Sequence, residues 1–210
     1  MYLTEPSTTA SDLLLGIVGL ISAQRLFRIS VPARRGATRM WGGALLAMSL
    51  AALLGAVHHA VLGQVSPAAD RALWTTVLWM VGVGSVFMLA ASARATLGGA
   101  MRRIITAIAW LEFAVYVWWI LGHPVFEYVI LDYGSAMVMV LVIQAWGSYR
   151  RREASASWIT GGVLVSFLAA GIEMYGSDPW PYFNHNDMFH LVQIVGVLLF
   201  YQGARRIRAR

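Results

Sequence analysis

MWGGALLAMSLAALLGAVHHAVL, which forms residues 40–62, contains no aspartate, glutamate, lysine or arginine. An α-helix needs about 20 consecutive apolar residues to cross the hydrocarbon core of a bilayer. Glycine and alanine make up much of this stretch, and such small residues let neighbouring helices approach closely inside a membrane. We therefore predict a membrane-spanning helix over residues 40–62, and we expect it to lie centrally in a helix bundle.

Similar apolar stretches recur along the whole chain. Together they predict helices over residues 11–26, 40–62, 72–93, 103–121, 125–146, 158–175 and 187–203. The chain is 59% hydrophobic and only 12% charged, whereas a soluble domain carries about 25% charged residues. Because a backbone in lipid has to satisfy its own hydrogen bonds, helices are the expected spanning elements. The expected fold is an all-α membrane protein, a single seven-helix domain over residues 1–210, with Ser11 or Asp12 capping the first helix.

The arginines indicate how these helices are oriented. They cluster after the first, third, fifth and seventh helices, whereas the intervening loops contain only Arg71. Basic loops stay in the cytoplasm, so we expect the N-terminus outside and the C-terminus inside, in a multi-pass protein of the bacterial inner membrane. The clustered residues are Arg28, Arg34, Arg35, Arg39, Arg94, Arg102, Arg103, Arg150, Arg151, Arg152, Arg205, Arg206, Arg208 and Arg210.

The composition also excludes several kinds of site. The chain has no cysteine, which excludes disulfides and cysteine-ligated metals. It has no lysine either, so a retinal Schiff base cannot form. The net charge of +6 comes from arginines that flank apolar helices, so we expect no nucleic acid as a partner.

All five histidines fall at one level, at the helix ends that we expect to face outward. His58 and His59 end the second helix, His123 precedes the fifth, and His185 and His190 open the seventh. Ionisable groups inside a membrane are costly and mark functional sites. The polar residues at the same level that we take as further site candidates are Asp70, Asp132, Glu173, Asn186 and Asp187.

Histidines in such a group predict a zinc site. Imidazole nitrogens bind zinc, and a catalytic zinc keeps three protein ligands and one position for a water nucleophile. We expect His59, His190 and His185 to hold zinc, with Asp70 transferring the proton. His185 and His190 are five residues apart and share no helix face, so His185 converges only if it precedes the seventh helix.

Two segments resemble motifs of the CREST superfamily of seven-helix membrane proteins, which includes alkaline ceramidases, adiponectin receptors and Per1-like proteins. In GAVHHAVLG, His59 resembles the zinc histidine of the second helix, and Asp70 follows it at a spacing similar to that in ceramidases. In NDMFHLVQ, His190 resembles the second histidine of the pair that opens the seventh helix.

The resemblance implies a zinc-dependent hydrolase that cleaves an amide or ester bond in a membrane lipid. It also implies that the zinc ligands come from the second and seventh helices. Two positions depart from the pattern, because Gly55 stands where the group has a serine and Asn186 stands where it has the first histidine of the pair.

Other functions stay open on the sequence alone. A degenerate metal site would leave a non-catalytic seven-helix protein that binds a lipid or another ligand. His58 or His59 could ligate a b-type haem together with His190. Glu112, near mid-membrane, could relay protons with Asp132 in a transporter, or it could form a single interhelical hydrogen bond.

Overall fold

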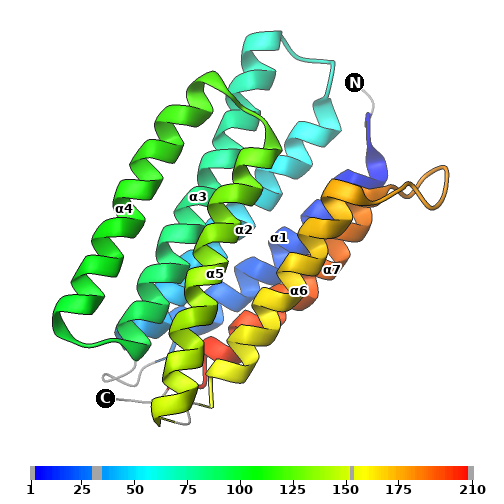
Figure 1. The fold of residues 1–210 in the computed structure, drawn as a ribbon. Coiled ribbons are helices and arrows are strands. Elements are labelled where there is room, and N and C mark those ends of the chain that lie inside the picture. The colour runs from blue at the N-terminus through cyan, green and yellow to red at the C-terminus, as the bar shows by residue number, and fades with distance from the viewer. Residues whose placement is uncertain (1–2, 30–34, 152–153, 208–210) are drawn as a thin grey trace.

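The structure is a computed structural model that describes residues 3–29, 35–151 and 154–207. Within these residues the fold is an all-α bundle of seven helices, each long and apolar enough to cross a membrane (Figure 1). The helices are α1 (Pro6–Phe27), α2 (Arg35–Val61), α3 (Pro67–Thr96), α4 (Gly99–Gly122), α5 (Phe126–Arg151), α6 (Ala156–Tyr175) and α7 (His185–Ala204). The expectation of seven spanning helices is confirmed, and the chain is an integral, multi-pass membrane protein.

The start of α1 differs most from the sequence prediction. The helix begins at Pro6, in the first helical position, rather than at residue 11. Proline suits that position because its fixed φ angle matches the helix and its missing N–H would have no partner there. The expected cap at Ser11 or Asp12 is therefore wrong, since both residues lie inside α1 and are buried.

Two helices form the interior of the bundle. α3 packs against α2, α4 and α5, and none of its large hydrophobic side chains, all of which the structure describes, is exposed. α2 contacts α1, α3 and α7, which confirms the central position expected for the second helix. α4 is peripheral and exposes residues such as Leu111 and Trp118 along its outer face, as a lipid-facing helix would.

α6 and α7 run side by side and pack closely against each other (Figure 1). A Cβ atom added to Gly162 of α6 would lie only 2.6 Å from Cδ1 of Phe200 on α7. The Phe200 ring also stacks on Trp41 of α2, with the ring centroids 5.3 Å apart. Small residues thus allow the close approach that helix pairs in membranes use.

The two ends of the bundle differ in charge. All the described arginines except Arg71 lie near the end at which α1, α3, α5 and α7 finish. Arg34, Arg152, Arg208 and Arg210 lie outside the described residues. We call the opposite end, where these four helices begin, the site end, because the histidines gather there.

Candidate functional site

The residues before α1 cross the end of α2 and bring two acidic residues toward the histidines. The backbone N–H of Thr4 donates to the carbonyl of Ala60 at 3.3 Å, and that of Glu5 donates to the carbonyl of His59 at 3.3 Å. This attachment places the Glu5 carboxylate against the His59 ring, with Oε2 2.6 Å from Nδ1. α1 then continues into the bundle beside α2.

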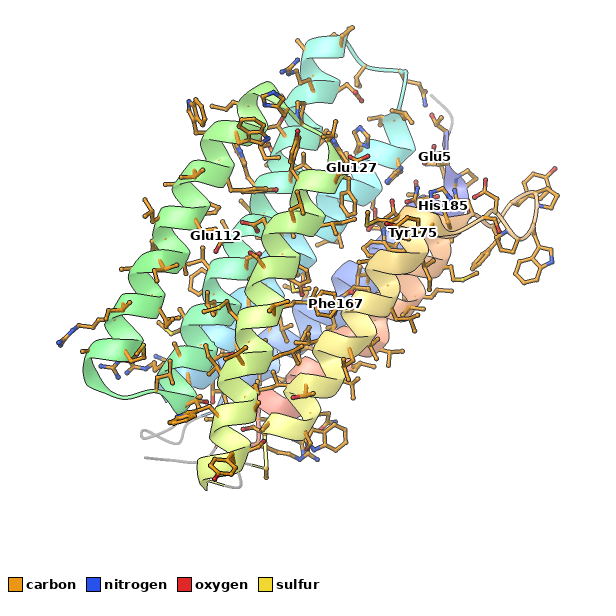
Figure 2. All side chains as sticks on the ribbon, viewed as in Figure 1. Glu5, Glu112, Glu127, Phe167, Tyr175 and His185 are labelled. Carbon is orange, nitrogen blue, oxygen red and sulfur yellow. The ribbon has the colours of Figure 1, made fainter. Side chains whose placement is uncertain are left out.

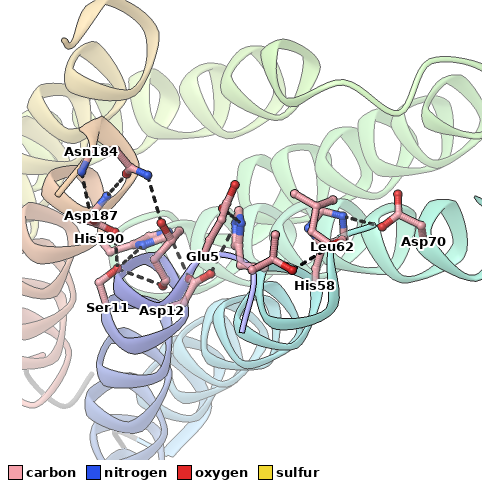
Figure 3. A network of polar contacts seen from close by, with 12 residues as sticks. Glu5, Ser11, Asp12, His58, Leu62, Asp70, Asn184, Asp187 and His190 are labelled. Carbon is pink, nitrogen blue, oxygen red and sulfur yellow. Dashed lines mark hydrogen bonds and ion pairs between the residues drawn. The ribbon is translucent and has the colours of Figure 1, made fainter. Parts of the chain in front are cut away.

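Asp12, one turn and a half into α1, is the centre of the site. Its side chain is 6% exposed, and Oδ1 lies 3.1 Å from Nε2 of His190 on α7. Its other oxygen, Oδ2, lies 4.0 Å from Nε2 of His59 on α2. One buried carboxylate thus faces imidazoles from two other helices (Figure 3). Sequence analysis missed this role, because it assigned Asp12 to a helix cap.

The other ring nitrogen of His190 is also occupied. Ser11 Oγ lies 2.9 Å from Nδ1 of His190 and 3.4 Å from Oδ1 of Asp187. Asp187 in turn completes a capping box with Asn184, the residue before α7. Its carboxylate accepts from the Asn184 backbone N–H at 2.9 Å. The predicted site residue Asp187 therefore orients the start of α7 and the Ser11 hydroxyl that holds the His190 ring.

His58 faces a different neighbour from His59. Successive residues on a helix point about 100° apart, and His58 turns toward α3. There its Nε2 lies 3.3 Å from Oδ1 of Asp70, and its ring packs on Trp74 with centroids 4.9 Å apart. Asp70, the expected catalytic acid, thus pairs with His58, whereas His59 pairs with Glu5 and faces Asp12 (Figure 3).

His185 is the first residue of α7 and does not precede the helix. Its Nδ1 lies 2.8 Å from Oδ1 of Asp178, which is in the exposed loop between α6 and α7. This hydrogen bond is the main reason that the pKa of Asp178 is lowered from its usual value. Beside it, the Asn186 amide nitrogen, oriented as a donor, lies 2.7 Å from Oε2 of Glu173 on α6.

The remaining candidate, Asp132, belongs to a separate polar contact between α3 and α5. Ser85 of α3 donates to Oδ2 of Asp132 at 2.7 Å. Glu112 of α4 accepts a hydrogen bond from Ser135 of α5 (Figure 2), so it forms the interhelical bond that the sequence left as one possibility. These residues link helices on the α4 side of the bundle.

A cavity of about 240 Å³ extends from Asp12 into the bundle. It reaches along α2 from His59 to Met48, a distance of about 16 Å at the rise of an α-helix. Aspartate, glutamate, asparagine and histidine side chains line its site end, and mainly apolar side chains line the rest. The lining residues on α1, α2 and α3 are Asp12, Met48, Ala51, Ala52, Gly55, His59, Trp74, Val77 and Val81. Those on α5, α6 and α7 are Phe126, Val129, Ile130, Tyr133, Gly134, Met137, Ser166, Phe167, Ala170, Glu173, Asn186, Phe189, His190 and Gln193.

The expected three-histidine zinc set is not assembled in the described structure. His59 and His190 face the same carboxylate, but His185 pairs with Asp178. Over residues 3–29, 35–151 and 154–207, no group of three or more histidine, aspartate or glutamate side chains has an arrangement that could hold a metal ion. Zinc therefore stays a prediction.

Comparison with known proteins assigns the chain to a family. A family model described as a family of unknown function (DUF6962) matches residues 7–209. The chain belongs to this family. No curated protein and no solved structure matches the chain.

Two sequence signals identify Asp12 as an interior residue of this DUF6962 member. The apolar run that starts at Leu13 and ends with α1 at Phe27 would rise only about 22 Å. A hydrocarbon core is about 30 Å thick, so the helix has to begin earlier. Pro6 marks a suitable start, and a start at Pro6 places both Ser11 and Asp12 within the span.

Proposed function

We propose that the protein binds a membrane amphiphile, with the polar headgroup at Asp12 and the apolar chain in the cavity beneath. The observation that carries this proposal is the cavity itself, whose aspartate, glutamate and histidine residues lie at one end and whose mainly apolar lining extends toward mid-bundle. Ligand sites in proteins are mainly apolar and contain a few polar groups that fix orientation. A molecule with one polar end and one apolar chain matches that distribution.

The site end faces outward in this proposal. Arginines flank the helices at the other end, and arginine-rich ends stay in the cytoplasm. The N-terminus is then outside the cytoplasm and the C-terminus inside, in the bacterial inner membrane. A headgroup at Asp12 would lie just below the outer headgroup region, and its chain would run parallel to lipid chains.

The cavity is covered on one side by α5 and α6, and this side offers a route from lipid. Gly134 of α5 and Phe167 of α6 both line the cavity, and Phe167 lies between the two helices (Figure 2). A Cβ atom added to Gly134 would lie 3.9 Å from the Phe167 ring, an ordinary contact. A rotation of this single aromatic side chain would therefore change the barrier between the cavity and the bilayer.

Photolabelling of the reconstituted protein tests the proposal. Single-chain amphiphiles with twelve carbons and a terminal diazirine would be added to nanodiscs, and labelled residues would be mapped by mass spectrometry. We expect labels on residues in the deep part of the cavity, such as Met48 and Met137. We expect about tenfold less labelling in Ala170→Phe, which fills the cavity.

Ala114→Phe is the matched control, because Ala114 is exposed on the outer face of α4. It adds the same aromatic group to the lipid-facing surface and should leave cavity labelling unchanged. Labels confined to lipid-facing residues, or equal labelling of Met48 in wild type and Ala170→Phe, would contradict an amphiphile in the cavity.

Zinc-dependent hydrolysis of a lipid amide or ester is the second candidate function. It draws on the proximity of Asp12 to both His59 and His190, because two imidazoles and one carboxylate are a ligand combination that catalytic zinc sites use; the three side chains would have to move closer together to hold an ion. A relation to the CREST superfamily stays a prediction alongside it. In this candidate Asp12 takes the ligand role that the sequence assigned to His185.

Elemental analysis of the purified protein separates the two candidates. A zinc hydrolase should contain one zinc per chain, which His59→Ala and His190→Ala should remove. His58→Ala is the control, since His58 pairs with Asp70 and does not line the cavity. A zinc content far below one ion per chain in wild-type protein would contradict the zinc hydrolase and leave amphiphile binding as the remaining candidate.

A further inference from the structure

We infer that the headgroup of the amphiphile is cationic, an amine or a quaternary ammonium group. The inference rests on the proposed function and adds the chemical class of the ligand. Three features of the site end support it: an excess of acidic side chains, a Glu173 carboxylate whose close partner is a neutral amide, and a row of aromatic rings.

Acidic groups outnumber basic ones around the cavity. Asp12 and Glu173 line it, and Glu5 and Asp187 lie in the next layer, against the two histidine sites. None of the described lining residues is an arginine, and the chain has no lysine. Counted as side chains, four carboxyl groups stand against the two imidazoles of His59 and His190 at this end. A buried charge is costly unless it is paired, so the cavity favours a positive ligand.

Glu173 lines the cavity from α6. In the described part of the chain no arginine or histidine forms an ion pair with it, and its close partner is the neutral amide of Asn186. Arg71, a basic residue at the same end, donates to the carbonyl of Leu121 at 3.0 Å. A cationic headgroup placed between Glu173 and Asp12 would supply the missing positive charge.

Three aromatic rings line the same end of the cavity. Phe126 lies between Trp74 and Phe189, with ring centroids 6.2 Å and 6.0 Å apart. Trp74 is held in place by its indole N–H, which donates to the carbonyl of Pro124 at 3.0 Å. The faces of such rings attract ammonium groups, and aromatic side chains are a common means of binding quaternary ammonium ligands.

The photolabelling experiment with three headgroups tests this inference. The twelve-carbon diazirine probes would carry a trimethylammonium, a sulfate or an uncharged sugar headgroup. We expect the trimethylammonium probe to label the cavity at a concentration about tenfold lower than the other two. Glu173→Gln should remove most of that preference, and Asp12→Asn provides a second variant at the centre of the site.

Glu127→Gln is the control, since Glu127 is exposed at the start of α5 and does not line the cavity. It removes the same charge at the same end of the bundle. An equal loss of preference in Glu127→Gln and Glu173→Gln would assign the effect to general surface charge and overturn the inference.

The two proposals fail in different ways. Cavity labelling by the uncharged or sulfate probe at the same concentration as the ammonium probe would overturn the cationic headgroup and leave amphiphile binding standing. Absence of cavity labelling by all three probes would overturn both proposals.

Discussion

Asp12 of α1 occupies the space beside Gly55 of α2, because a Cβ atom added to Gly55 would lie 2.7 Å from Oδ2 of Asp12. The resemblance to the CREST superfamily implies a serine at this position of the second helix. Here the side chain is absent, and a carboxylate from the neighbouring helix reaches the same place. The two features are therefore linked, since a side chain at residue 55 would displace the Asp12 carboxylate from its present position near His59 and His190.

Gly55→Ala should displace Asp12 and destabilise the protein. A methyl group at 2.7 Å from a short, buried side chain forces a shift, and overpacking of this kind costs about 1–3 kcal/mol. Thermal unfolding in detergent would measure the change. Gly171→Ala on α6 is the control, because an added Cβ atom there meets no atom within 4 Å. Equal stability of the two variants would show that Asp12 does not depend on the space beside Gly55.

Asp12 and His190 should be strongly coupled in a double-mutant cycle. Asp12→Ala and His190→Ala each remove a close polar partner from a buried side chain, at a cost of about 1–3 kcal/mol. The double variant should be less unstable than the sum of the two, with a coupling free energy of about 0.5–3 kcal/mol. Reversible unfolding in mixed micelles would provide the values. Additive effects would mean that the two side chains do not interact in the membrane.

The fold could be predicted because two independent patterns agree in the sequence. The apolar stretches indicate the helices, and the alternation of arginine-rich and arginine-poor ends requires an odd number of them. The start of α1 was predicted too late, because Ser11 and Asp12 are residue types that favour a helix cap over a helix interior. The thickness of the bilayer and the proline at residue 6 indicate the earlier start, since α1 is too short without Ser11 and Asp12.

The site could be predicted only in part, because contacts between helices are not encoded in local spacing. His59 and His190 were expected to meet, and the structure brings both to Asp12. The sequence could not indicate that Asp70 would face His58, because the rotation of α2 determines which of two adjacent histidines turns to α3. His185 was assigned by ligand type, and its hydrogen bond to Asp178 depends on the loop before α7.

Ser85→Ala should destabilise the contact between α3 and α5. The Ser85 hydroxyl donates to the buried carboxylate of Asp132 at 2.7 Å, and removal of a donor to a buried acceptor costs about 1–3 kcal/mol. Ser148→Ala is the control, because Ser148 is exposed near the end of α5. Unfolding of both variants in detergent gives the difference. A loss confined to Ser148→Ala would contradict a structural role for the Ser85 hydroxyl.

The hydrogen bond between Asp178 and His185 should stabilise the protein only above acidic pH. The pKa of Asp178 is lowered, mainly by the hydrogen bond to the His185 side chain and then by the bond to its backbone N–H. A group whose pKa is lower in the folded state contributes stability above its unfolded value, about 3.9 for aspartate, and loses it as the pH falls through the folded value. Asp178→Asn should therefore unfold at a lower temperature than wild type at pH 6, and the difference should shrink below about pH 4.

Thermal unfolding of both proteins across this pH range measures the difference in unfolding temperature. Glu127→Gln, which removes an exposed carboxylate at the same end of the bundle, is the comparison. A difference that grew as the pH fell would mean that the ionised carboxylate of Asp178 is not the form that the folded protein favours.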